Sequence, residues 1–154
     1  MGAPLLLGGA SFQTSQTLPL SAEFPAGARI RRPNPAAYAV LSAISAALRL
    51  RGYGITKPRC GKPDDVRCRC TLRDCYIEMI LIAEGRSADT LAFNLDAWGY
   101  TKVHNAAKYS ELTETWQQLT LVINEIVSER FAVGPVKWLR PDEVDARYAG
   151  KIST

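Results

Sequence analysis

The feature that most constrains the fold of this chain is a long amphipathic segment in its C-terminal third. Apolar residues recur there every three or four positions over four turns, which is the spacing of one helical face. These residues are Leu112, Trp116, Leu119, Ile123, Ile126 and Val127. We expect a helix that starts near Ser110 and ends near Phe131. A helix with one apolar face needs a sheet or other helices on which to bury it.

Two strands are predicted directly before this helix. Residues 76–83 are rich in β-forming residues and nearly all apolar, as in a strand that is covered on both faces. Residues 90–100 alternate between apolar and polar side chains, and a polar turn separates the two runs. Together they predict a hairpin. After the helix, residues 136–140 fit a short edge strand because Pro141 stops them.

A second helix is predicted before the hairpin. Asn34 and Pro35 are a favourable cap and first residue for a helix, and Gly52 is a favourable stop. Residues 1–33 lack periodicity and are rich in Ser, Thr, Gly, Pro and Gln, which predicts an extended or disordered N-terminal arm. The apolar runs fall short of the roughly 20 residues that a transmembrane helix needs.

The expected fold is therefore an α+β two-layer sandwich with the element order α-β-β-β-α-β, in which the cysteine segment before residues 76–83 is counted as the first strand. An antiparallel or mixed sheet of three or four strands would carry two main helices on one face. Residues 34–154 would form a single α+β domain that includes a Cys-rich basic segment, residues 57–75.

The charge of the chain is divided unevenly along its length. Residues 29–73 contain eleven Lys or Arg against two Asp, a local balance of +9, whereas the balance from residue 74 onwards is −4. A local excess of positive charge attracts polyanions such as nucleic acid, an anionic lipid surface or an acidic protein. The cations expected to contact such a partner are Arg49, Arg51, Lys57, Arg59, Lys62, Arg67, Arg69 and Arg73. The alternative is a solvated basic loop that only aids solubility.

The four cysteines all lie in the Cys-rich basic segment, at positions Cys60, Cys68, Cys70 and Cys75. On a strand, Cys68 and Cys70 would share one face and could not easily join each other. Two pairings are then open, Cys60–Cys68 with Cys70–Cys75 or Cys60–Cys70 with Cys68–Cys75. Either pairing would staple the segment and place the protein outside the reducing cytoplasm, in the periplasm or secreted.

Zinc and free thiols are the alternatives to disulfides. Zinc ligands usually occur as Cys-x2-Cys or Cys-x4-Cys pairs, and only Cys70 and Cys75 have such a spacing. The Cys-x-x-Cys motif of redox enzymes is absent. We expect no cofactor, with structural zinc as the lesser alternative.

Few residues indicate catalysis. His104 is the only histidine, and no nucleophile stands at a recognisable spacing from it. The expected element order resembles the core of the PD-(D/E)xK nucleases, and Pro63, Asp64 and Glu78 resemble the first half of their motif. That resemblance implies metal-dependent phosphodiester cleavage, but Ile80 stands where the family carries its lysine. The sequence therefore favours a protein without catalytic residues.

Aromatic residues give one further indication of binding. Trp98 and Tyr100 share the polar face of residues 90–100, where they either contact a partner or pack beneath another segment. We expect a small non-enzymatic binding or assembly protein, exported and stapled by disulfides, that engages an acidic partner through its basic surface. The first alternative is an intracellular nucleic-acid-binding module with zinc or free thiols, and the second is a divergent metal-dependent nuclease.

Overall fold

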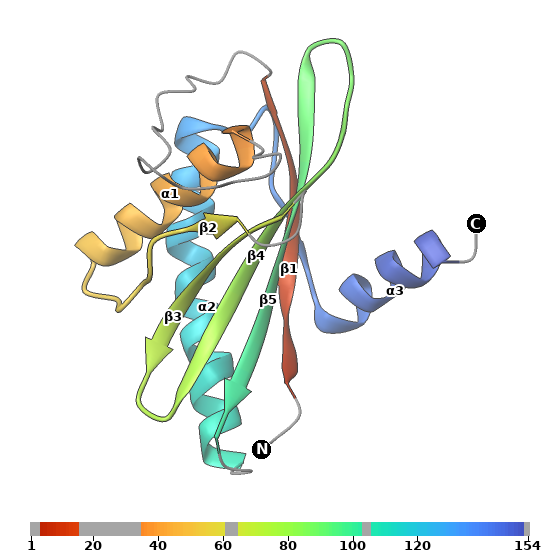
Figure 1. Ribbon diagram of the computed structural model, residues 1–154. Coiled ribbons are helices and arrows are strands. Elements are labelled where there is room, and N and C mark those ends of the chain that lie inside the picture. The colour runs from red at the N-terminus through yellow and green to blue at the C-terminus, as the bar shows by residue number, and fades with distance from the viewer. Residues whose placement is uncertain (1–3, 16–34, 61–64, 103–105, 153–154) are drawn as a thin grey trace.

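The computed structural model describes residues 4–15, 35–60, 65–102 and 106–152. Their elements are β1 (Leu5–Ser15), α1 (Pro35–Leu50), β2 (Arg59–Cys60), β3 (Asp65–Leu72), β4 (Cys75–Arg86), β5 (Thr90–Thr101), α2 (Ala106–Arg130), β6 (Lys137–Leu139) and α3 (Pro141–Ile152). The strands form one sheet in the order β2-β3-β4-β5-β1-β6, with every neighbouring pair antiparallel. Figure 1 shows α1 and α2 along one face of this sheet and α3 apart from them, on the far side of β1.

The expected α+β class is confirmed, but the expected sheet of three or four strands with two main helices on one face is wrong. The described residues form six strands and three helices. The edge strand expected at residues 136–140 is confirmed as β6, whereas β2 has only two residues, too few to leave a pattern in the sequence. β1 comes from the stretch that we expected to be an extended or disordered arm, and it lies inside the sheet between β5 and β6.

β1 shows no alternation in the sequence because both of its faces are covered. The five residues from Leu6 to Ala10 are all buried. A Cβ atom on Gly9 would overlap the backbone oxygen of Leu95 and press against Val144 of α3. The close approach of β5 and α3 therefore requires glycine at this position, although glycine weakens the strand signal in a sequence.

The apolar core lies between the sheet and the pair α1 and α2. From α1 it takes Val40, Leu41, Ile44 and Leu48, and from α2 it takes Leu112, Trp116, Leu119, Ile123 and Val127. These are largely the residues whose spacing predicted the two helices. None of the helices in the described ranges combines the length and the apolarity needed to cross a membrane, as expected.

The end of α1 leads the chain onto the edge of the sheet. Gly52 has a φ of +95°, and the N–H of Tyr53 donates to the Leu48 carbonyl at 3.1 Å, as in a Schellman cap. The chain then pairs with β3, since Thr71 N–H donates to the Gly54 carbonyl at 2.8 Å. The expected cap Asn34 lies outside the described residues.

Candidate functional site

The polar side chains of the sheet gather on the face opposite α1 and α2, which we call the outer face. Side chains alternate along each strand, so the register places them in rows that cross β3, β4 and β5. One row contains Arg67, Ile80 and Asp96, the next contains Arg69, Glu78 and Trp98, and the third contains Thr71, Tyr76 and Tyr100. The outer face therefore brings arginines, one glutamate and aromatic rings onto one surface.

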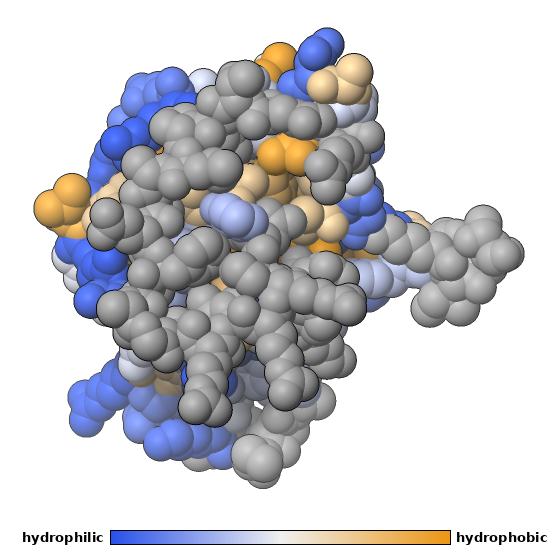
Figure 2. Space-filling model, turned by 45° about the horizontal axis from the view of Figure 1, so that its top comes forward, coloured by the Kyte–Doolittle hydropathy of each residue, from blue (hydrophilic) through white to orange (hydrophobic). Residues whose placement is uncertain are grey.

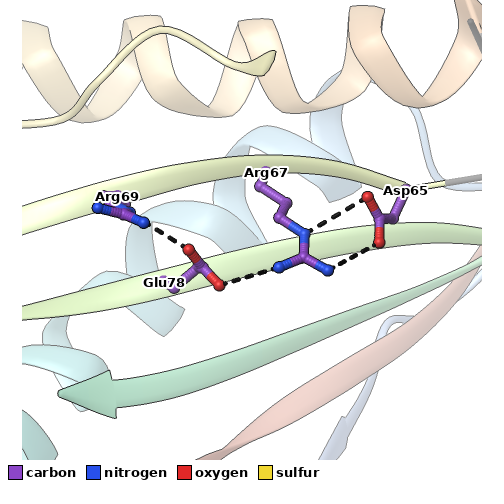
Figure 3. A network of polar contacts seen from close by, with 4 residues as sticks. All are labelled: Asp65, Arg67, Arg69 and Glu78. Atoms are coloured by element: carbon purple, nitrogen blue, oxygen red, sulfur yellow. Dashed lines mark hydrogen bonds and ion pairs between the residues drawn. The ribbon is translucent and has the colours of Figure 1, made fainter. Parts of the chain in front are cut away.

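An ion-pair network joins Arg67 and Arg69 through one glutamate (Figure 3). Arg67 donates to Asp65 from Nε and Nη2 at 3.4 and 3.0 Å, and its Nη1 donates to Glu78 Oε1 at 3.4 Å. Arg69 Nε donates to Glu78 Oε2 at 3.2 Å. The Glu78 side chain is only 7% exposed, so a nearly buried carboxylate holds both guanidinium groups. The hydrogen bond to Asp65 raises the pKa of Arg67, which therefore stays charged.

Arg69 is fixed in place but retains unused donors. Its guanidinium lies over the ring of Tyr76, 4.8 Å from the ring centroid, while Nε is held by Glu78. Its backbone is fixed too, because Arg69 N–H donates to the Thr56 hydroxyl at 2.8 Å. Among the described residues nothing accepts a hydrogen bond from Nη1 or Nη2, and the side chain is 41% exposed. Such a pre-positioned fork can accept a phosphate or carboxylate with little loss of side-chain entropy.

Two tyrosines form a ring pair beside Arg69. Tyr76 and Tyr100 face each other across β4 and β5, with their ring centroids 4.8 Å apart and their planes inclined by 12°. Both side chains are half-buried. They line a pocket of about 320 Å³ with Thr71, Leu72, Asp74, Cys75, Thr101 and Lys102. Sequence reasoning named Tyr100 but missed Tyr76, because residues 76–83 were interpreted as one continuous apolar strand.

The remaining predicted cations do not all lie on the outer face, because Arg49 and Arg51 stand at the end of α1, which covers the opposite face of the sheet. Arg49, Lys57, Arg59 and Arg73 are exposed. Arg59 pairs in register with Arg67 and so extends the arginines to the edge of the sheet. Arg51 differs because it forms an ion pair with Glu125 of α2 at 3.0 Å. Lys62 lies outside the described residues. Figure 2 shows hydrophilic residues along the left side and at the lower left of the molecule, with hydrophobic residues among them.

The structure shows no disulfide, since all four cysteines are free thiols. Cys68 and Cys70 point to the inner face, beneath α1, and are 2% and 0% exposed. Cys75 and Cys60 share that face through their register with Leu72 and Val66. The expected staple is replaced by packing, because a thiol in a core behaves as a small apolar side chain. Burial raises the pKa of Cys68 to about 12 and that of Cys70 to about 11.

The residues that suggested a nuclease do not form an open acidic site. Glu78 is occupied by the two arginines, and Ile80 lies beside it on the same face. Asp64 and His104 lie outside the described residues. Within the described ranges, no three side chains of the metal-binding types His, Cys, Asp and Glu come together in a group that could hold an ion. Glu78 therefore acts to position Arg67 and Arg69.

A second polar cluster, which the sequence did not predict, attaches α3 to the outer face. The fully buried carboxylate of Asp96 accepts hydrogen bonds from Arg147 and from the Tyr148 hydroxyl. Arg147 also donates to Asn94 Oδ1 at 2.9 Å and to the Ser11 hydroxyl at 3.3 Å. Burial, together with the hydrogen bond to Asp96, raises the pKa of Tyr148 to about 12. These contacts cover the part of the outer face over β5 and β1.

The part of the outer face that α3 leaves uncovered therefore lies over β3 and β4. The Tyr76–Tyr100 ring pair borders this part on one side, and the edge strand β2 borders it on another. Trp98, the other aromatic named from the sequence, lies in the same row as Arg69 and Glu78 and is half-buried.

No protein-family model matches the sequence, and comparisons with curated proteins and with solved structures give no match either.

Proposed function

We propose that this protein is a non-enzymatic binding module that holds a polyanion on the β3 and β4 side of its outer face. The observation that carries the proposal is the state of Arg69. Its guanidinium is held by Glu78 and by the Tyr76 ring, yet its side chain is 41% exposed and its two terminal nitrogens make no hydrogen bond within the described residues. These donors are free to bind a phosphate or carboxylate group of a ligand.

The surroundings of Arg69 support the same proposal. Arg59 and Arg67 lie next to it on the outer face, and Lys57 is exposed on the chain that borders β3. Two carboxylates, Asp65 and Glu78, neutralise part of this charge and fix its geometry. The remaining cations are suited to long-range attraction of a polyanion and would release counterions when it binds.

The predicted export of the protein loses its main argument, because the structure contains no disulfide among the four cysteines. The predicted location in the periplasm or outside the cell depended on the two bridges, and the structure has four free thiols instead. Export stays a prediction of the sequence. Polyanion binding does not depend on it, because Arg69 and its neighbours are positioned by the sheet.

The experiment measures binding by fluorescence anisotropy with two labelled probes, a twelve-residue oligo(dT) and a poly-glutamate peptide of equal charge. We expect at least one probe to bind with an affinity that falls steeply with salt. Arg69→Ala should weaken that binding about ten- to hundredfold, because it removes charge-assisted hydrogen bonds.

Arg140→Ala is the matched control, since Arg140 is 75% exposed and lies at the start of α3. It removes the same charge from a distant part of the surface and should change affinity little. Failure of both probes to bind, or equal losses in the Arg69 and Arg140 variants, would rule out the proposed function.

A further inference from the structure

We infer that the polyanion is a single-stranded nucleic acid, with one of its bases bound at the Tyr76–Tyr100 ring pair. The inference rests on the proposed function and names its partner. Arg69 and Tyr76 lie in neighbouring rows of the outer face and are already in contact through the ring. Rows on a strand are two residues apart, about 7 Å, so one ligand can reach both the guanidinium and the rings.

The two rings offer a stacking surface, which a nucleobase can use and an acidic peptide cannot. Base–aromatic stacking accepts any base because each has a π-face, and it contributes strongly to single-strand binding. The pair Tyr76 and Tyr100 is already stacked, with ring planes inclined by 12°. A planar group can extend this stack with little reorganisation. A chain of carboxylates would satisfy the cations but leave both rings unused.

The pocket beside the rings has the size and chemistry for one base. Its volume of about 320 Å³ is at the lower end of the range of roughly 300 to 1,000 Å³ that is typical of ligand pockets. Lys102, which is exposed, lines it and can neutralise a phosphate. Asp74 also lines it, and a carboxylate can accept a hydrogen bond from an N–H group of a base.

The geometry also separates this site from sequence-specific duplex recognition. The ring pair lies on the outer face of an antiparallel sheet, and α1 and α2 run along the opposite face (Figure 1), so a ligand at the rings meets strands and not the side of a helix. A sheet with exposed rings binds bases that are not paired in a duplex.

The test compares three probes of equal charge by fluorescence anisotropy: oligo(dT), an abasic strand of the same length, and poly-glutamate. We expect wild-type protein to bind oligo(dT) at least about tenfold more tightly than the abasic strand. Tyr100→Leu should remove that preference while leaving affinity for the abasic strand unchanged. Tyr100→Phe keeps the ring and should keep the preference.

The outcomes distinguish this inference from the proposed function. Equal affinity of wild-type protein for oligo(dT) and the abasic strand would overturn the base site and leave polyanion binding intact. Tighter binding of poly-glutamate than of oligo(dT) would identify an acidic protein as the partner and overturn the inference. Binding to none of the three probes would overturn both. The wild-type comparison is decisive even if Tyr100→Leu fails to fold.

Discussion

Individual cysteines in this protein differ in reactivity because they differ in burial. Cys68 and Cys70 are enclosed by the core, while Cys60 on the short edge strand is half-buried. The folded pKa of Cys68 is raised from 9.0 to about 12, chiefly by burial. Folding therefore keeps this thiol protonated. Its contribution to stability is complete below about pH 9 and is lost as the pH rises toward 12.

The expected result of thiol labelling at pH 8 with an aromatic disulfide reagent is a single fast phase from Cys60. Cys68, Cys70 and Cys75, which are all buried, should react only after urea unfolds the protein, because buried neutral thiols are poor nucleophiles. The absorbance of the released thiolate measures each phase. Cys60→Ser should remove the fast phase, and Cys70→Ser should leave it unchanged. A fast phase that survives in the Cys60→Ser variant would show that the inner face is open to solvent.

At the scale of elements, α3 is held mainly by charge. Asp96 has a side chain only 1% exposed and pairs with Arg147, whose side chain is 17% exposed. Val144 is the one fully buried apolar residue among the side chains of α3 that the structure describes. A buried ion pair loses much stability when only one partner is removed, since the other charge stays behind without compensation.

Replacing Asp96 with Asn should lower the free energy of unfolding by about 3 kcal/mol, as expected for one lost partner of a buried pair. Urea denaturation followed by circular dichroism measures this loss. Hydrogen exchange should show the amides of α3 opening before those of α2. The control is Asp142→Asn on the same helix, where the ion pair is exposed and the change should stay within about 0.5 kcal/mol. An unchanged urea midpoint for Asp96→Asn would contradict the role assigned to this pair.

Elements with a regular period could be predicted from the sequence, and irregular ones could not. α2 and the β4–β5 hairpin each have a regular pattern of apolar residues, and that pattern predicted them. β1 is covered on both faces, and its Gly9 lies against the backbone of Leu95. For these reasons its sequence does not alternate between apolar and polar residues. α3 was absent from the expected element order, because its attachment is polar, through Arg147 and Tyr148, and leaves no apolar period in the sequence.

The candidate site was predictable in composition but not in arrangement. The arginines of β3 and the ring of Tyr100 were evident in the sequence as a basic segment and as an aromatic on a polar face. Their convergence depends on the register of β3, β4 and β5, which sets Arg69 opposite Glu78 and beside Tyr76. Register depends on the whole sheet, so no local pattern could reveal it.

On the scale of the whole molecule, β1 connects the two halves of the sheet. It pairs with β5 on one side and β6 on the other, and Ala10 and Phe12 contribute to the core. Removing residues 1–15 should therefore abolish cooperative unfolding, because β5 and β6 would each lose a neighbour. Urea titration and size-exclusion chromatography measure this loss. A truncated chain with the wild-type transition would show that β1 is dispensable.

A point variant gives a graded form of the same test. Gly9→Ala should destabilise the protein by about 1 to 3 kcal/mol, because the added methyl group overlaps Leu95 of β5. Gly85→Ala is the control, since a Cβ atom there meets nothing within 4 Å. The two variants add the same methyl group, so a difference between their urea midpoints reports the tight fit of β1.

The place of β1 in the sheet also bears on how the chain is made. A ribosome synthesises β1 first, but Leu5 pairs with Gly99 and Ser11 pairs with Lys137. At typical rates of translation, on the order of ten seconds separate the emergence of β1 from that of its last partner. For that interval an apolar strand lacks at least one of its neighbours and is open to association with other chains. A chaperone or a low local concentration would limit such association until β5 and β6 have appeared.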